Sequence, residues 1–267
     1  MIKLNGQIIE QNHFPDGSLL MKVDPQGDKF EMDRGAIIID WHYENDAELF
    51  TLICLKRHLD RHFTNPSIVL YMPYIPHARM DRVKADEDVF TLKYFCETIN
   101  SLHFDIVFIT DVHSNVAPAL LEHVVQLKVT STIERVKEDC GAQVLCFPDE
   151  GAMKRYSSNA TKPFAFGMKN RDWATGQILG LNIINSDNIV GKDVLIIDDI
   201  CSRGGTFYHS ATALKTAGAK SVKLYITHCE NTIKDGQIFD SDLIDTIFTT
   251  HSLIHEDAVA ARVTYIN

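Results

Sequence analysis

The chain has 267 residues, of which 45% are hydrophobic, and it carries a formal net charge of −10. This length suits two domains of ordinary size or one large one, with enough apolar residues for a well-buried core. The acidic balance argues against a general nucleic-acid-binding or anionic-membrane surface. No apolar run has the length that a bilayer span needs, and the first residues lack the apolar core of a signal peptide.

The cysteines are scattered, without a CxxC pair, and most of them lie in apolar segments. This pattern predicts free thiols in a reducing compartment and neither a disulfide framework nor a zinc site. We therefore expect a soluble cytoplasmic protein with no membrane or nucleic-acid partner. The six cysteines are Cys54, Cys96, Cys140, Cys146, Cys201 and Cys229.

Near the N-terminus, the residues Phe14-Pro15-Asp16-Gly17 separate two short extended segments. Proline fixes φ, aspartate hydrogen-bonds to the backbone that follows it, and glycine tolerates positive φ. The sequence therefore predicts a hairpin. Residues 35–40 then predict a buried strand, and the apolar spacing after Asn45 or Asp46 predicts a helix.

Polar residues follow several buried strands at the point where each strand is expected to stop. Since ligands of open α/β sheets bind beyond the carboxyl ends of strands, these residues are candidates for a site. The loop after residues 67–72 contains two prolines, which exclude a helix there. The pairs of strand and polar residues are 67–72 with Arg79, 105–110 with Asp111 and His113, 143–147 with Asp149, and 194–197 with Asp198 and Asp199.

Val194–Ile197 is too short for a helix and too apolar for an edge strand, so it predicts a central strand covered on both faces. After the two acids and a polar loop, the spacing of apolar residues predicts a helix that ends before Gly218. The loop of residues 202–206 thus aims backbone N–H groups and a helix dipole at one point, which suits a phosphate. Asp198 and Asp199 suit sugar hydroxyls or a divalent cation beside it. The candidate phosphate-binding residues are Ser202, Arg203, Gly204, Gly205 and Thr206.

Further strands are expected at 162–171, which runs into a basic loop with Lys169 and Arg171, and at 222–227, 244–250 and 261–266. The alternation of strands and helices predicts an α/β fold with doubly wound parallel sheets. The strand pattern breaks near residue 140. We therefore expect two similar lobes, an N-terminal lobe of residues 1–140 and a C-terminal lobe of residues 141–267, with the active site between them.

Two motifs carry a resemblance to a known family. The string from Asp198 to Thr206 resembles the binding loop of the phosphoribosyltransferase superfamily, which holds a ribose 5-phosphate. Residues 72–82 together with Asp111-Val112-His113 resemble the paired signatures of ribose-phosphate diphosphokinase, also called PRPP synthetase. Residues 14–18 are similar to the hairpin of that family that reaches a neighbouring subunit's nucleotide. The order and spacing of these motifs match over nearly the whole chain.

The resemblance implies Mg²⁺-dependent transfer of the β,γ-diphosphoryl group of ATP to the anomeric hydroxyl of a ribose 5-phosphate moiety, with release of AMP. The resemblance also implies a homo-oligomer in which the hairpin contacts a neighbouring subunit. By this resemblance, ATP is bound by Arg79, His113, Phe14 and Asp16, and Mg²⁺ is held by His113 and Asp149. The catalytic cations are Lys169 and Arg171. The ribose phosphate is bound by Asp198, Asp199 and residues Ser202 to Thr206.

Ser202 and Arg203 depart from the family loop, which most often has an acid and a threonine before the two glycines. Arginine adds an always-charged group beside the 5-phosphate. The acceptor is therefore expected to be ribose 5-phosphate or, as an alternative, ADP-ribose, whose diphosphate would serve NAD salvage. A phosphoribosyltransferase and a catalytically inactive regulatory paralogue are the remaining alternatives.

Each candidate residue also has a purely structural alternative. His113 alone suits a satisfied core histidine, and Lys169 with Arg171 suits a solvated edge. Asp149, Asp198, Asp199 and Thr206 are all residue types that cap helices. The joint pattern, and not any single residue, favours the functional interpretation.

Overall fold

The computed structural model describes residues 1–24, 35–157, 164–171, 178–253 and 263–266. The chain divides into two compact units, Met1–Lys128 and Val129–Asn267. Helix α4 (Thr130–Asp139) belongs to the second unit, because its residues Ile133 and Val136 are part of that unit's core. The division therefore precedes residue 140, where the strand pattern alone suggested a boundary.

The first unit contains a mixed sheet in the strand order β2-β1-β5-β6-β7-β8. Strands β5 to β8 are parallel, and β1 pairs antiparallel with both β5 and β2. The sheet and its helices share one core, in which Trp41 and Phe95 lie with ring centroids 5.9 Å apart. The elements are β1 (Ile2–Leu4), β2 (Gln7–Ile8), β5 (Ala36–Trp41), α1 (Ala47–His62), β6 (Ser67–Tyr71), α2 (Thr91–Asn100), β7 (Ile106–Thr110), α3 (Val116–Leu120) and β8 (Val124–Leu127).

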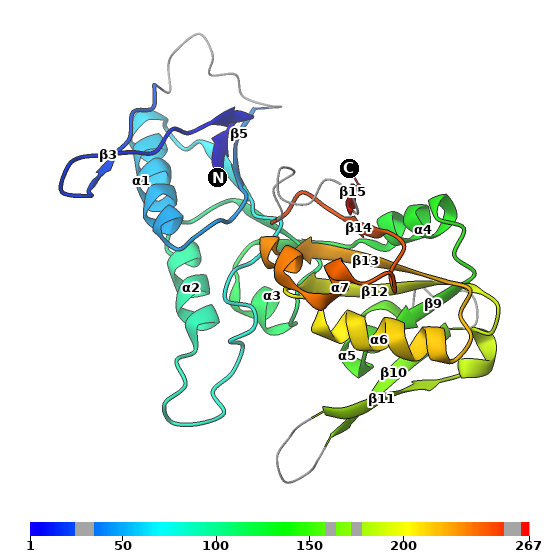
Figure 1. Ribbon diagram of the computed structural model, residues 1–267. Helices are drawn as coiled ribbons and strands as arrows, with labels where there is room; N and C mark the ends of the chain where they lie inside the picture. The colour runs from blue at the N-terminus through cyan, green and yellow to red at the C-terminus, as the bar shows by residue number, and fades with distance from the viewer. Residues whose placement is uncertain (25–34, 158–163, 172–177, 254–262, 267) are drawn as a thin grey trace. The chain divides into compact units, whose positions relative to one another are not determined.

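The predicted hairpin is present as β3 (Asn12–His13) and β4 (Leu19–Leu20), which pair antiparallel (Figure 1). The backbone N–H of Gly17 donates to the carbonyl of Phe14 at 2.8 Å, and Gly17 has the positive φ of +83° that this turn requires. The Asp16 carboxylate accepts hydrogen bonds from the Ser18 amide at 2.9 Å and the Ser18 hydroxyl at 2.6 Å. The expected aspartate-to-backbone bond therefore forms.

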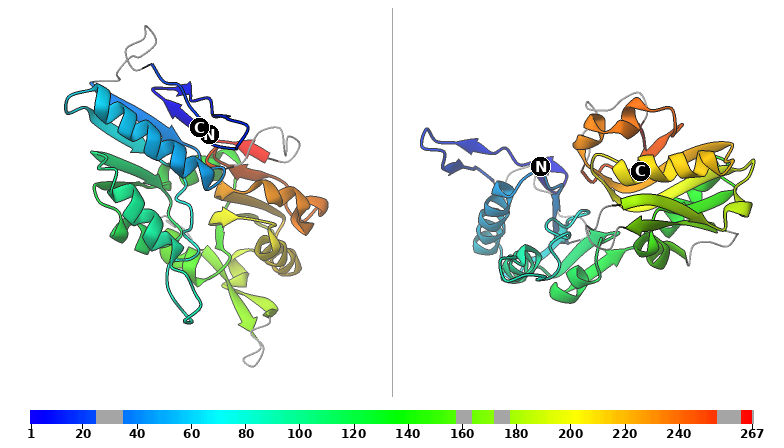
Figure 2. Two further views of the ribbon diagram at one scale, coloured as in Figure 1. Left: turned by 90° about the vertical axis from the view of Figure 1, so that its left-hand side faces the viewer. Right: turned by 60° about the horizontal axis from the view of Figure 1, so that its bottom comes forward.

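The second unit contains a sheet in the order β11-β10-β9-β12-β13-β14-β15, in which β11 alone among the described strands runs antiparallel to its neighbour. The helices lie on both faces of this sheet, as Figures 1 and 2 show. The elements are α4, β9 (Val144–Phe147), α5 (Glu150–Tyr156), β10 (Phe164–Arg171), β11 (Ile178–Ile184), η2 (Ser186–Asn188), β12 (Asp193–Cys201), α6 (Gly205–Thr216), β13 (Ser221–Cys229), η3 (Asn231–Asp235), α7 (Gln237–Asp240), β14 (Ile247–Thr249) and β15 (Val263–Tyr265).

Strand β12 is buried on both faces, as its apolar run predicts. Val194 and Ile196 pack in the core cluster that includes the α6 residues Phe207, Ala211 and Leu214. The alternate residues Leu195 and Ile197 pack in a second cluster with α4 and α5. Because side chains alternate across a strand, the two clusters lie on opposite faces of the sheet.

Two local predictions are wrong. Asp198 and Asp199 lie inside β12 and not beyond its end, because the parallel pairing with β13 continues to Cys201, which is opposite Cys229. Lys169 and Arg171 lie in β10 and not on a loop, because β11 supplies an antiparallel partner, with Lys169 opposite Leu181. Both strands are longer than their apolar runs, since a neighbouring strand provides hydrogen bonds beyond the run.

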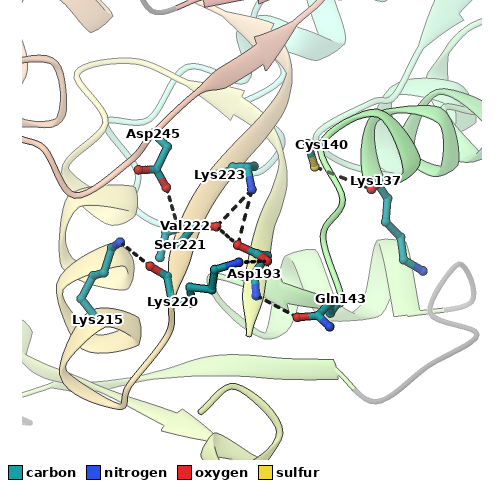
Figure 3. Close-up of polar contacts among 10 residues, drawn as sticks. All are labelled: Lys137, Cys140, Gln143, Asp193, Lys215, Lys220, Ser221, Val222, Lys223 and Asp245. Atoms are coloured by element: carbon teal, nitrogen blue, oxygen red, sulfur yellow. Dashed lines mark hydrogen bonds and ion pairs between the residues drawn. The ribbon is translucent and has the colours of Figure 1, made fainter. Parts of the chain in front are cut away.

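Polar contacts link the strands of the second sheet at the end where β12 and β13 begin (Figure 3). The Asp193 carboxylate accepts from the Ser221 hydroxyl and from the Lys220 ammonium, the latter at 3.0 Å. The Asp245 carboxylate accepts from the Val222 amide at 3.0 Å. The candidate site residues of this unit lie toward the other end of these strands, where β12 and β13 stop.

The described cysteines include all six of the chain, and each is a free thiol, as predicted. Among the described residues, no helix combines the length and the apolar character that a bilayer crossing requires.

Candidate active site

The candidate phosphate loop of residues 202–206 leads directly into helix α6. Gly204 is the N-cap residue, with a φ of +73°, so Thr206 lies inside the helix and does not cap it. The first intrahelical bond that involves Gly204 runs from the Tyr208 amide to the Gly204 carbonyl at 2.9 Å. The N–H groups of the first helical turn have no acceptor within the helix, and the first turn of α6 contains no acidic side chain. These free N–H groups and the positive end of the helix dipole suit an anion, and the role of the loop as a phosphate site stays a prediction.

A carboxylate pair follows from the positions of Asp198 and Asp199 in β12. Asp199 is almost fully buried, and Asp198 is largely so. One guanidinium nitrogen of Arg155, Nη2, donates to Oδ1 of Asp198 at 2.9 Å and also to Oδ1 of Asp199. Arg155 lies on α5, so the ion pair joins that helix to the central strand.

Burial raises the pKa of the Asp198 carboxyl well above its usual range, and the neighbouring Asp199 charge raises it further. The Arg155 guanidinium opposes both effects, while the charge of Asp149 adds to them. The charges of Asp199 and Asp149 therefore both favour the neutral form of Asp198, whereas the guanidinium of Arg155 favours its charged form.

Asp149 has a structural role in the fold. It is the N-cap of α5, and its Oδ1 accepts a hydrogen bond from the Ala152 amide at 3.1 Å. The capping alternative for this residue is therefore observed. A role at Mg²⁺ stays a prediction, as does that of His113, which belongs to the first unit.

The donor chemistry of this group fits Mg²⁺. The described residues contain no cluster of three or more potential ligand side chains. Mg²⁺ bound with nucleotide phosphates commonly takes only one or two carboxylates and keeps several waters, so a larger cluster is not needed. The carboxylate of Asp149 is of the oxygen-donor type that Mg²⁺ prefers, and its role at the ion stays a prediction.

In the first unit, the loops that follow β6 and β7 meet at Asp81. The buried Asp81 carboxylate accepts from Arg82 Nε at 2.7 Å and Nη2 at 3.1 Å. The hydrogen bond from Arg82 lowers the pKa of Asp81 most, with further lowering by a Ser114 hydrogen bond and the charge of His113. Asp81 therefore lies beside His113, one of the predicted ATP-binding residues.

Two non-glycine residues in these loops adopt left-handed backbone conformations, His77 with a φ of +63° and Asp111 with a φ of +44°. Asp111 is buried, whereas Arg79 is exposed. Strained backbone of this kind concentrates at ligand sites, because surrounding contacts hold it in place. His77 is held by its Nε2, 3.1 Å from the Asp46 carboxylate, and by ring contact with Phe95 at 5.5 Å.

The remaining predicted site residues are Phe14, Asp16, Lys169 and Arg171. Phe14 is half exposed beside the hairpin turn, and the Ser18 hydrogen bonds lower the pKa of Asp16. Lys169 and Arg171 are placed by their backbone in β10, and their side chains lie outside the described part of the structure. The roles of these four residues stay predictions.

Sequence reasoning missed Arg155, Asp81 and Glu230. Asp81 lies inside the motif of residues 72–82 and could have been found there. Arg155 and Glu230 have no motif of their own, because their importance comes from contacts with Asp198, Asp199 and Ser202, which lie far away in the sequence.

Residues 152–255 match the family model of the phosphoribosyl transferase domain. Ribose-phosphate pyrophosphokinase of Pyrococcus furiosus is 25% identical, over 82% of this chain and 77% of the relative. Ribose-phosphate pyrophosphokinase 2 of Archaeoglobus fulgidus is 28% identical, over 85% of this chain and 77% of the relative. The chain is thus similar to ribose-phosphate pyrophosphokinases over most of its length.

The fold agrees with this similarity. The crystal structure of phosphoribosylpyrophosphate synthetase from Mycobacterium smegmatis matches 97% of this chain and 85% of that one, with a TM-score of 0.77 and 18% identity. The predictions of a ribose-phosphate pyrophosphokinase homologue, of its α/β fold and of an enzyme of the diphosphotransferase class are therefore confirmed.

Proposed function

We propose that the chain transfers the β,γ-diphosphoryl group of ATP to the anomeric hydroxyl of a ribose 5-phosphate moiety, which yields a sugar 1-pyrophosphate and AMP. The observation that carries this proposal is the start of helix α6, with Gly204 as its N-cap, shortly after a strand that contains a buried carboxylate pair. A helix start without acidic residues holds a phosphate, and the carboxylates accept from sugar hydroxyls. The similarity to the ribose-phosphate pyrophosphokinases supports the choice of reaction.

In this proposal the 5-phosphate binds the main-chain amides of residues 204–206, and Asp198 with Asp199 orients the ribose. Arg155 holds both carboxylates in place and limits their mutual repulsion. The ribose thereby presents its anomeric hydroxyl in a fixed position. Such positioning supplies a large part of the catalysis of phosphoryl transfer.

We assign Arg79 and His113 to the ATP phosphates, and Lys169 and Arg171 to the charge that develops on the transferred group. Asp81 holds the loop of Arg79 against the loop of His113, so that both residues are presented together. Mg²⁺, when bound near Asp149, would neutralise phosphate charge. Phe14 and Asp16 are proposed to contact the nucleotide of a neighbouring subunit in a homo-oligomer.

The acceptor is ribose 5-phosphate in the first form of the proposal and ADP-ribose in the second. Arg203 is exposed at the phosphate loop, where its guanidinium is available to a second phosphate. A diphosphate acceptor such as ADP-ribose would use that group, and its product would serve NAD salvage. The two acceptors need the same chemistry at the anomeric hydroxyl.

The test is incubation of the protein with Mg-ATP and either ribose 5-phosphate or ADP-ribose, followed by mass spectrometry of both products. We expect AMP and an acceptor that has gained one diphosphoryl group. AMP in the absence of either acceptor would indicate hydrolysis and contradict the proposal. Formation of product only from PRPP and a base would instead indicate a phosphoribosyltransferase, and no turnover of any kind would indicate an inactive paralogue.

The catalytic assignment has its own test. Lys169→Ala and Arg171→Ala should each lower turnover by roughly 100-fold or more, since removal of one group that stabilises transition-state charge commonly costs that much. Lys192→Ala, an exposed lysine outside the site, is the matched control and should keep normal turnover. Near-normal rates in both site variants would refute the roles assigned to Lys169 and Arg171.

A further inference from the structure

The phosphate loop, residues 202–206, contacts residues 230–238, a segment that contains none of the motifs described above. This segment follows β13 and comprises η3 and the start of α7. Its first contact is on the backbone, where the Glu230 amide donates to the Cys201 carbonyl at 2.8 Å. The segment therefore begins beside the last residue before the loop.

The Glu230 carboxylate binds the first side chain of the loop. Its Oε2 accepts from the Ser202 hydroxyl, and it also accepts from the Thr232 hydroxyl at 3.3 Å. The two hydroxyl oxygens are themselves 3.3 Å apart. The hydrogen bond from Ser202 to Glu230 fixes the first side chain of the loop beside this segment. We take the main-chain amides at 204–206 as donors to the anion.

Two glycines let the loop and the segment approach closely. A Cβ atom on Gly236 would lie 1.8 Å from the Arg203 carbonyl oxygen, far inside contact distance. The φ of Gly236 is −105°, a value open to any residue, so the need for glycine here is purely steric. From the other side, a Cβ on Gly204 would lie 2.5 Å from Cγ2 of Ile238.

We infer that Glu230 and Gly236 are positioning residues of the phosphate loop: Glu230 fixes Ser202, Gly236 admits the Arg203 carbonyl, and together they set the direction of the amides at 204–206. The inference rests on the proposed function, because the anion these amides meet is taken to be the 5-phosphate of the acceptor. Neither residue touches the reacting atoms. Their effect is on the affinity for the acceptor.

Gly236→Ala is the sharpest test, because the added methyl group must displace the Arg203 carbonyl. We expect a rise in the KM of ribose 5-phosphate, up to about 100-fold, since a displacement near 1 Å at a site can cost that much. The KM of ATP should stay within about twofold of wild type, because the contacts of Glu230 with Cys201 and Ser202 and of Gly236 with Arg203 all lie at the phosphate loop. Asp235→Ala and Gln237→Ala change exposed neighbours and are the matched controls, with unchanged constants expected.

The Glu230 variants provide a second test that does not depend on added volume. Glu230→Gln keeps an acceptor oxygen for Ser202 and should retain most of the acceptor affinity, whereas Glu230→Ala removes it and should lose affinity. Equal behaviour of the two Glu230 variants, or a Gly236→Ala enzyme with the constants of its controls, would overturn the inference. If Gly236→Ala fails to fold, the Glu230 pair decides alone.

Amide hydrogen exchange of the free protein separates this inference from the proposed function. Peptides that cover residues 202–206 should exchange faster in Gly236→Ala and Glu230→Ala than in wild type and in the Asp235→Ala control. Faster exchange in a protein whose wild type forms no AMP with either acceptor would support the positioning role and refute the proposed reaction. Unchanged exchange and unchanged acceptor binding would refute the positioning role itself.

Discussion

Removal of Arg155 should measure how much this cation contributes to the free energy of unfolding through its ion pairs with Asp198 and Asp199. In the variant Arg155→Ala, Asp198 and Asp199 would remain largely buried without the guanidinium that binds both of them. Loss of one partner of a buried ion pair costs about 3 to 5 kcal/mol. Since the Arg155 side chain is 24% exposed, we expect the lower end of this range, about 3 kcal/mol.

This free energy corresponds to a measurable change in thermal stability. For a unit of about 140 residues, the entropy of unfolding is near 0.3 kcal/mol/K, so the Tm of the second unit should fall by about 10 °C at pH 8. The fall should be smaller at pH 5. Burial already raises the pKa of Asp198, so protonation at lower pH relieves part of the uncompensated charge.

Calorimetric unfolding at both pH values is the assay. Lys154→Ala removes an exposed positive charge from the same helix and is the matched control, with a Tm within about 1 °C of wild type because surface changes are usually small. The double variant Arg155→Ala/Asp198→Asn should recover part of the loss. A Tm loss in Arg155→Ala that is equal at pH 5 and pH 8, or no larger than that of Lys154→Ala, would refute the reasoning.

Three further changes have defined outcomes. Asp198→Asn should raise the Tm relative to wild type, and the difference should grow from pH 4 to pH 8. The reason is that the pKa of Asp198 is raised, so the wild-type protein loses stability as this carboxyl ionises. A Tm difference that shrinks as the pH rises would contradict this. Glu48→Ala should cost about 2 to 3 kcal/mol, since Glu48 accepts from buried Trp41 Nε1 at 2.9 Å, and Glu48→Gln, which keeps an acceptor, should cost less in calorimetry. Asp193→Asn should lower the Tm at pH 7, because hydrogen bonds from Ser221 and Lys220 lower the pKa of Asp193, and the loss should shrink as acid protonates the wild-type carboxylate. A loss that stays equal from neutral to acidic pH in calorimetry would speak against those bonds.

The strands that carry the fold were predictable because they are buried on two faces. Val194 to Ile197 is a continuous apolar run, and its residues alternate between two core clusters. The ends of such strands were not predictable, since they depend on the neighbour. Strand β12 extends through two aspartates because β13 continues beside it. Strand β8 has only four residues, none of them buried, so it does not show the pattern of a buried strand.

In the candidate site, too, some residues could be predicted from the sequence and others could not. Asp198, Asp199 and the glycine pair were proposed from the sequence, because acids and a glycine-rich helix start after an apolar run have a direct physical meaning, and their roles stay predictions. Arg155 was not found, because its role arises from a hydrogen bond that spans more than forty residues. Gly236 was not found either, because only the folded chain shows that a side chain there would collide with the Arg203 carbonyl.

The central claim is that the diphosphoryl group moves as one unit from ATP to a sugar phosphate held at the start of α6. Phosphorus NMR of a reaction with Mg-ATP and the active acceptor tests this claim most directly, because it counts every phosphorus-containing product. The account predicts one AMP and one sugar pyrophosphate for each ATP consumed. ADP together with a sugar that has gained a single phosphate, or orthophosphate in step with ATP loss, would contradict it.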